Sequence, residues 1–77
     1  MQHSRLELHI DITKSLMNYG PLSLDKMSLY LKIDPKSLKE HMIFLVAQGI
    51  IKEEDNNSTM TYTVAERGIK VLKFFKI

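Results

Sequence analysis

The chain has 77 residues, 44% of them hydrophobic, and no cysteine, which fits one small domain without disulfides. A monomer of this size buries only about 60% of the surface that its unfolded chain exposes, so self-association is an ordinary way to gain stability. Lys and Arg number 11 against 9 Asp and Glu, and the resulting charge of +2 permits nucleic-acid binding without requiring it. An architectural protein that coats DNA would normally carry a larger positive excess.

Secretory and membrane classes are disfavoured by the sequence. The first residues lack the long apolar core of a secretory signal. No stretch approaches the roughly 18 apolar residues that a membrane span needs. The default location is therefore the cytoplasm. His3, His9 and His41 are scattered without ligand spacing, so we expect no metal, no cofactor and no small-molecule effector.

The first predicted helix begins after Ser4 and ends near Tyr19. Ser4 followed by Glu7 three residues later is typical of a capping box. Gly20 suits the left-handed position after a helix, and Pro21 prevents its continuation. Helical spacing predicts a buried face made of apolar side chains: Leu6, Ile10 and Met17, widened by Ile12 and Leu16.

Two short helices joined by a polar turn follow. Residues 21–22 are expected to be extended and to form a one-bridge strand, and Ser23 caps the second helix. In the turn, residues 32–34, Ile33 is expected to point inward. Asp34-Pro35 is a strong start for the third helix, which we predict over residues 35–48. The buried faces of these helices are expected to hold Leu24, Met27 and Leu31, then Leu38, Met42, Leu45 and Val46.

The remaining segment predicts a hairpin and a last helix. Residues 50–54 read as a strand, residues 55–58 as a polar turn, and residues 59–64 alternate apolar side chains with threonines as a half-buried strand does. The last helix covers residues 65–77. The fold class is therefore α+β and mostly α, in a single domain over residues 1–77.

This order of elements resembles the winged helix-turn-helix fold of archaeal transcription regulators: a three-helix core, a two-stranded wing and a C-terminal helix. Residues 38–51, LKEHMIFLVAQGII, are similar to the family's recognition-helix signature of leucines ending in Gly-Leu-Ile. The stretch YTVAERGIKVL is similar to the family's Tyr-x-Ile-Thr-Glu-Lys-Gly segment, which opens the last helix. The matching positions are Tyr62, Val64, Glu66, Arg67 and Gly68.

The resemblance implies a sequence-selective protein that binds double-stranded DNA and regulates transcription, with helix 35–48 in the major groove. Two features depart from the family pattern. Ala65 replaces the usual capping Thr, so the last helix is expected to fray or slide at its start. Ile43 and Phe44 replace the polar pair in the middle of the recognition helix.

Exposed side chains near the start of the third helix are the main candidates for DNA contacts. Lys36 and Lys39 suit phosphate or guanine, and Ser37 suits either, with backbone N–H groups of the helix start beside it. Glu40 can accept from a cytosine amino group or be repelled by phosphate. The alternative for all of them is a merely solvated face. The full predicted set is Lys26, Lys32, Lys36, Ser37, Lys39, Glu40, Asn56 and Asn57.

Two further features leave alternatives open. His41 is more typical of a packing or rim residue than of a ligand. In the wing, the acids at residues 53–55 are unfavourable beside DNA. Asn56 and Asn57 at the tip either bind phosphate or only satisfy the geometry of the turn. Lys26 and Lys32 either touch flanking phosphates or only keep the protein soluble.

The last helix carries more apolar surface than a small core needs, and such a patch usually marks an interface. We expect a homodimer formed mainly through the last helix, with help from the first. It would present two recognition helices about one DNA turn (~34 Å) apart, or a multiple of that distance. The alternative is a monomer whose last aromatics pack on the first helix. The expected interface residues are Ile69, Leu72, Phe74, Phe75 and Ile77.

A protein-interaction module without DNA binding would suit the acidic wing and the exposed Ile43 and Phe44. An enzyme is disfavoured, because the sequence has no nucleophile motif and no Gly-rich phosphate loop. Glu53 and Glu54 are adjacent in a strand and point to opposite faces, so they do not form a catalytic pair.

Overall fold

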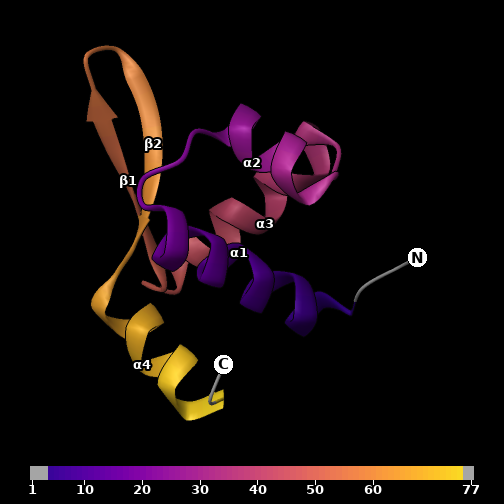
Figure 1. Cartoon of the computed structure of the whole chain (residues 1–77), viewed down its shortest axis with the longest axis vertical. Coiled ribbons are helices and arrows are strands. Elements are labelled where there is room, and N and C mark those ends of the chain that lie inside the picture. The colour runs from indigo at the N-terminus through magenta and orange to yellow at the C-terminus, as the bar shows by residue number, and fades with distance from the viewer. Residues whose placement is uncertain (1–3, 76–77) are drawn as a thin grey trace.

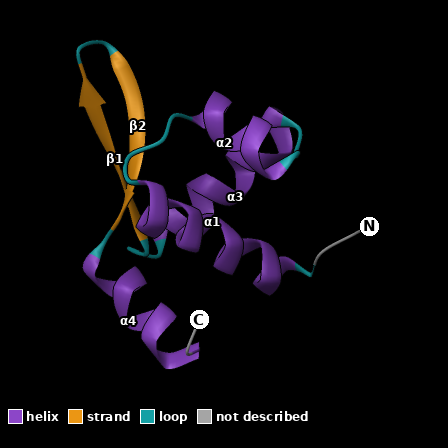
Figure 2. Cartoon of the chain, viewed as in Figure 1, coloured by secondary structure: helices purple, strands orange, loops and turns teal. Residues whose placement is uncertain are grey.

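The computed structural model describes residues 4–75, apart from the side chain of Phe75. Within that range it has four helices and one two-stranded antiparallel sheet (Figures 1 and 2). The hairpin stands beside the bundle of the first three helices, and its tip projects beyond them. The elements are α1 (Arg5–Tyr19), α2 (Leu24–Leu31), α3 (Pro35–Ala47), β1 (Ile51–Asn56), β2 (Thr59–Val64) and α4 (Glu66–Phe75).

Helix α1 begins and ends where its capping residues predict. The Ser4 hydroxyl accepts from the Glu7 N–H at 3.1 Å, and the Glu7 carboxylate accepts from the Ser4 N–H at 3.3 Å. This is a complete capping box. Gly20 ends the helix with a φ of 80°, a conformation that favours glycine.

The buried face of α1 was predicted incorrectly in part. Leu6 and Met17 are 54% and 43% exposed. Thr13 and Ser15 take buried places instead, because each hydroxyl donates a 2.8 Å bond to the carbonyl one turn earlier. Burying a hydroxyl costs little free energy once it is hydrogen-bonded. The buried face of α1 is therefore rotated relative to the face that the spacing of apolar residues predicts. The other predicted members do lie inward: Ile10 is half-buried, and Ile12 and Leu16 are buried.

The turn between α2 and α3 is fixed by bonds within it. Lys32 ends α2 in the left-handed conformation, with φ of 58°. The Ile33 N–H donates to the Ser28 carbonyl at 3.1 Å, and the Ser28 hydroxyl donates to the Ile33 carbonyl at 2.5 Å. Ile33 packs against the core as predicted. The angle at which α3 leaves α2 is therefore set by a closed pair of hydrogen bonds.

Helix α3 has a defined cap at each end. The Asp34 carboxylate accepts from the N–H groups of Lys36 and Ser37, and Pro35 occupies the first helical position. At the other end the Ile50 N–H donates to the Leu45 carbonyl and the Gly49 N–H to the Val46 carbonyl, both at 3.0 Å. This is the Schellman arrangement, in which Gly49 supplies the left-handed residue.

Strands β1 and β2 pair along their whole lengths. The turn is shorter than the predicted residues 55–58, because Asp55 and Asn56 belong to β1. Asn57 and Ser58 form it alone, with φ of 50° and 70°. Two consecutive positive φ values match the twist of the flanking strands, so pairing continues to the tip.

The predicted one-bridge strand before α2 is present. The Leu22 N–H donates to the Tyr62 carbonyl at 3.2 Å, and the Tyr62 N–H donates to the Leu22 carbonyl at 2.9 Å. This bridge joins the wing to the helix-turn-helix. The core lies between the helices and the hairpin and contains Ile12, Leu16, Met27, Leu38, Met42, Leu45, Ile51 and Tyr62.

Helix α4 starts at Glu66, one residue later than predicted. The fraying expected from Ala65 is opposed by two bonds: the Ala65 N–H donates to the Ile50 carbonyl at 2.9 Å, and the Arg67 guanidinium donates to the Gln48 carbonyl at 2.9 Å. These bonds anchor the helix start to the segment between α3 and β1, and α4 then packs against α1.

Candidate nucleic-acid interface

The first turns of α3 present the side chains predicted to meet DNA. Lys36, Ser37, Lys39 and Glu40 are all exposed, while Leu38 between them is fully buried. The expectation of free backbone donors here was wrong. The N–H groups of Lys36 and Ser37 donate to the Asp34 carboxylate at 3.1 and 3.2 Å, so a ligand would have to compete with that cap.

The other two predicted lysines of the helix-turn-helix, Lys26 on α2 and Lys32 in the turn, are also exposed. The only ion pair within residues 4–75 joins Lys70 to Glu66 at 3.8 Å, so none of the four lysines between residues 24 and 40 is neutralised by a close carboxylate. The same segment carries three acids, which leaves its local charge weakly positive.

The wing offers a polar tip on an acidic strand. Asn56 and Asn57 are exposed, and the Asn56 amide donates to the Thr61 hydroxyl at 3.4 Å. Farther from the tip, burial and then the nearby Glu53 raise the pKa of the Tyr62 phenol. The wing therefore presents few groups that favour phosphate, namely the amides at its tip and Lys52 at the other end of β1.

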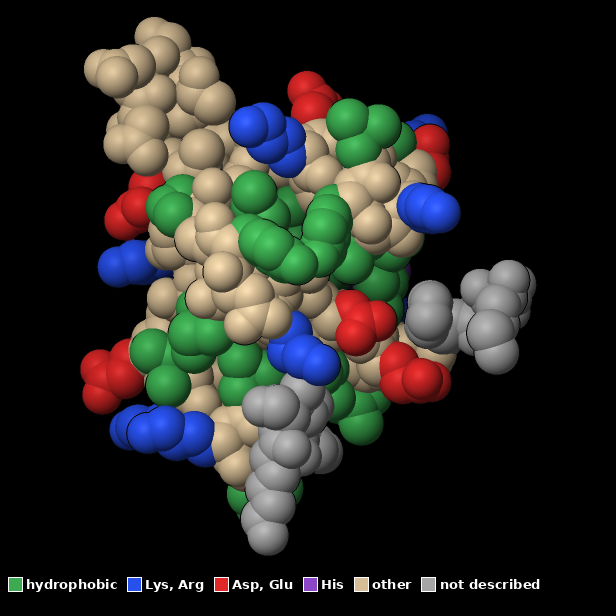
Figure 3. All heavy atoms as spheres, viewed as in Figure 1, with side chains coloured by type: hydrophobic (Ala, Val, Ile, Leu, Met, Phe, Trp, Pro, Cys, Tyr) green, Lys and Arg blue, Asp and Glu red, His purple; other side chains and the backbone are tan. Residues whose placement is uncertain are grey.

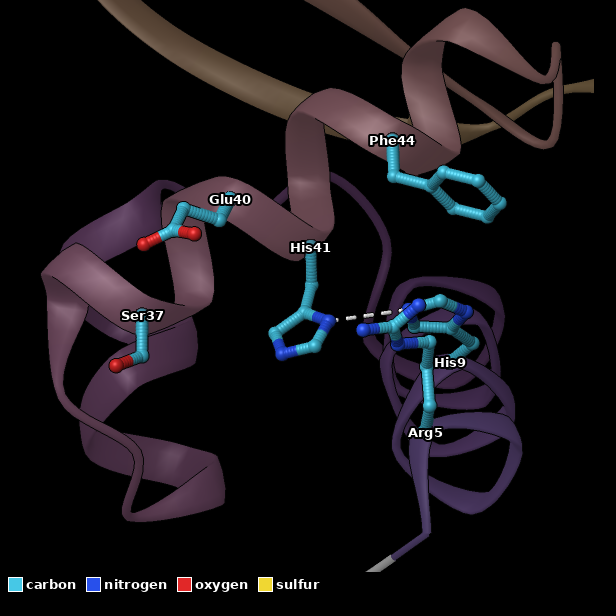
Figure 4. A pocket seen from close by; sticks show the side chains of 6 residues that line it. All are labelled: Arg5, His9, Ser37, Glu40, His41 and Phe44. Carbon is cyan, nitrogen blue, oxygen red and sulfur yellow. Dashed lines mark hydrogen bonds between the residues drawn. The ribbon is translucent and has the colours of Figure 1, made fainter.

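A pocket of about 340 Å³ lies between α1 and α3, beside the predicted recognition surface (Figure 4). His9 of α1 and His41 of α3 point toward one another across it, with 3.1 Å between His9 Nε2 and His41 Nδ1. The ring of Phe44 stacks on His9 at a centroid distance of 5.3 Å. The other side chains that line the pocket are Arg5, Ser37 and Glu40.

The environment of His9 favours its neutral form. Burial lowers the pKa of His9 below its ordinary value, and the neighbouring His41 and Arg5 lower it further. Both neighbours act through like charge, since a proton on His9 would be repelled by the guanidinium and by a protonated His41. His41 was predicted to be a packing or rim residue, and its ring does pack against that of His9.

Arg5 and His9 were missed by the sequence analysis. One half of the signal was present, because Ser37, His41 and Phe44 are spaced four and three residues apart and so share one stripe of α3. The rest of the pocket depends on the tertiary fold, which places the first two turns of α1 opposite that stripe. Nothing local to residues 5–9 indicates this.

The side chains predicted for a dimer interface differ in their exposure in the single chain. Phe74 is 81% exposed and Ile69 is half-buried, but Leu72 is only 7% exposed because it packs inward within the single chain. The side chain of Phe75 and the whole of Ile77 lie outside the described residues. Of the predicted interface side chains that the structure describes, Phe74 is the one left mainly exposed.

Comparison with known structures identifies the architecture. A point mutant of ZitR from Lactococcus lactis superposes with a TM-score of 0.78 over 88% of this chain, at 20% sequence identity. The fold is a winged helix-turn-helix. The match covers 48% of the ZitR chain, so this chain spans about half the length of that protein. No protein-family model and no curated protein sequence matches the chain.

In winged helix-turn-helix terms, α2 and α3 form the helix-turn-helix and the β1–β2 hairpin forms the wing. The structural neighbour comes from a bacterium, so the likeness supports the fold and leaves the archaeal family as an expectation. No helix within residues 4–75 is long and apolar enough to cross a membrane. In the same range, no three His, Asp or Glu side chains are grouped as metal ligands.

Proposed function

We propose that this protein binds double-stranded DNA in a sequence-selective manner and regulates transcription, with α3 in the major groove. The observation that carries the proposal is the leading half of α3. It is exposed on a helix-turn-helix, and its Lys36 and Lys39 have no carboxylate within ion-pair distance among the described residues. Lysines at such positions reach phosphates and guanine edges in helix-turn-helix complexes.

The second part of the proposal is that two copies associate through α4. Phe74 is a large apolar side chain that is mostly in water in the single chain. A twofold dimer buries the same patch on both subunits and presents two α3 helices to a roughly palindromic site. Sequence selectivity would then come from two half-sites whose spacing is fixed by α4.

The decisive experiment is selection from random duplexes at stated salt, followed by measurement of affinity at several salt concentrations. A bound protein that neutralises phosphates loses affinity linearly in log–log form as salt rises. We expect an enriched, roughly symmetric motif and a steep salt dependence. Affinity that stays flat between low and moderate salt, with no enriched motif, would refute the proposal.

One observation favours a second function, a protein-docking module without DNA binding. Ile43 and Phe44 on α3 are 59% and 47% exposed, and a second apolar patch lies between α1 and α2 (Figure 3). Ile43→Glu separates the two functions, because Ile43 is exposed but does not line the pocket between α1 and α3. Under the docking function it abolishes partner binding and spares affinity for duplexes, if any is present.

A further inference from the structure

Three basic side chains meet at the pocket between α1 and α3. Figure 4 shows the Arg5 side chain running alongside His9, with His41 facing both from α3. The contact between the rings uses His9 Nε2 and His41 Nδ1. His41 Nε2 is therefore left to face a ligand.

We propose that Arg5, His9 and His41 form a phosphate site at the edge of the recognition surface, which takes a backbone phosphate of the duplex. A guanidinium forms paired N–H bonds with phosphate oxygens, and an imidazole N–H supplies a further donor. The pocket of about 340 Å³ has room for a phosphate group, and Ser37 on its wall is the neighbour of Lys36 in sequence.

The guanidinium and the two imidazole rings of the pocket suit an anion, although only Arg5 carries a fixed positive charge before binding. Among the side chains of residues 4–74, no carboxylate forms an ion pair with Arg5. The charged and titratable groups that line the pocket are Arg5 and His9 from α1, with Glu40 and His41 from α3. Figure 4 shows the Glu40 carboxylate turned to the Ser37 side, away from the two rings. Three basic groups thus meet on one side, and one acid lies on the other.

An anion in this position makes proton uptake part of binding. Without a ligand, His9 is held neutral by burial and by its two basic neighbours. A phosphate reverses the electrostatic part of that environment. His9 can then take up a proton on Nδ1 while its Nε2–H still donates to His41 Nδ1, so the contact between the rings is kept. Complex formation then takes up one proton, and duplex affinity rises as pH falls from 8 to 6.

This inference rests on the proposed function, so the test must separate the two. Duplex affinity is measured by fluorescence anisotropy between pH 6 and 8 at constant salt. For one proton taken up, the wild-type dissociation constant falls by up to about tenfold per pH unit. His9→Gln should lose that dependence. Arg5→Gln, on an exposed residue, should lower the log–log salt slope by about one. The matched control is Lys70→Gln on α4, outside the pocket, which should keep the wild-type behaviour.

Lys36→Ala is the complementary control, because it should weaken binding equally at every pH. If the duplex binds but His9→Gln keeps the full pH dependence, and Arg5→Gln keeps the full salt slope, the phosphate site is overturned and the DNA-binding proposal stands. Urea unfolding of His9→Gln checks that it is folded, and Arg5→Gln decides the question if it is not.

If no duplex binds at any pH in low salt, the proposed function fails instead. The His9 and His41 ring resonances are then titrated with inorganic phosphate by NMR. Shifts of both rings would show that the pocket takes a free phosphate, which overturns its assignment to a DNA backbone. Absence of shifts would overturn the site itself.

Discussion

Gly68 lies against the carbonyl oxygen of Ile50, so that a Cβ at this position would collide with that oxygen and would approach Val64 Cγ1 to 2.8 Å. Helix α4 therefore approaches the residue that precedes β1 so closely that the position has room for a hydrogen atom and not for a Cβ. Gly68→Ala should destabilise the fold by about 1–3 kcal/mol, because a backbone atom cannot move aside as a side chain can. At a solvent-exposed helix position, Gly→Ala stabilises the protein by roughly 1 kcal/mol. The sign of the change in the free energy of unfolding, measured with urea, therefore tests the close contact.

Ser58 holds a φ of 70° in the two-residue turn of the wing, where a residue with a Cβ is strained. Ser58→Gly should raise the free energy of unfolding by about 0.5–1 kcal/mol, since relief of strain exceeds the added entropy of the unfolded chain. Asn57→Gly is the matched comparison and should gain less, because Asn tolerates this conformation. A thermal midpoint lowered by Ser58→Gly would contradict the turn geometry.

Stability should depend on pH through His9. Its pKa is lower in the folded chain than in the unfolded chain, so the unfolded state binds more protons as pH falls through about 6.5. The contribution of neutral His9 is therefore fully present above that value and is lost progressively below it, until the folded pKa is passed. Urea midpoints measured at pH 8 and pH 5 should differ less for His9→Gln than for wild type. An equal difference in the two proteins would rule out His9 as the cause.

Lys36 and Lys39 should act on binding through phosphate charge. Each change to Ala should reduce the log–log salt slope of duplex affinity by about one if the side chain meets phosphate. Lys70→Ala, on α4 and paired with Glu66, is the matched control and should leave the slope unchanged. A lysine that instead reads a guanine would weaken only the preferred sequence, by roughly 1–3 kcal/mol.

Phe74 should control the oligomeric state. Its side chain is 81% exposed, and Phe74→Glu places a charge that cannot be buried in an apolar interface. Analytical ultracentrifugation should then report one chain of 9.0 kDa where wild type sediments as two. Leu72→Glu is unsuitable as a test, because that side chain is buried in the single chain and its loss would unfold the protein. A Phe74→Glu protein that still sediments as two chains would exclude this interface.

The element boundaries were predictable because they are set by short-range chemistry. Ser4 with Glu7, Asp34 with Pro35, and Gly49 each satisfy or end a backbone pattern within four residues. The structure places helix ends within two residues of them. The order of helices and strands then follows. Such signals are readable because the partner of each capping group lies close in sequence.

Contacts between distant segments were not predictable. His9 meets His41 at a separation of 32 residues, and neither position carries a local signal of the other. The inward face of α1 was mistaken because buried hydroxyls of Thr13 and Ser15 find carbonyls one turn back, which hydropathy spacing does not register. The same limit applies to Leu72, whose burial depends on α4 folding back against α1.

The paired backbone bonds between Leu22 and Tyr62 hold the wing and the segment that leads into α2 at a fixed separation. Any duplex that touches both the wing tip and α3 must therefore fit one distance and one angle. A stiff duplex of the wrong groove width would bind weakly, although its bases offer α3 the same contacts. A flexible duplex could bend to fit. The shape of the double helix would therefore affect affinity even far from any base that α3 touches.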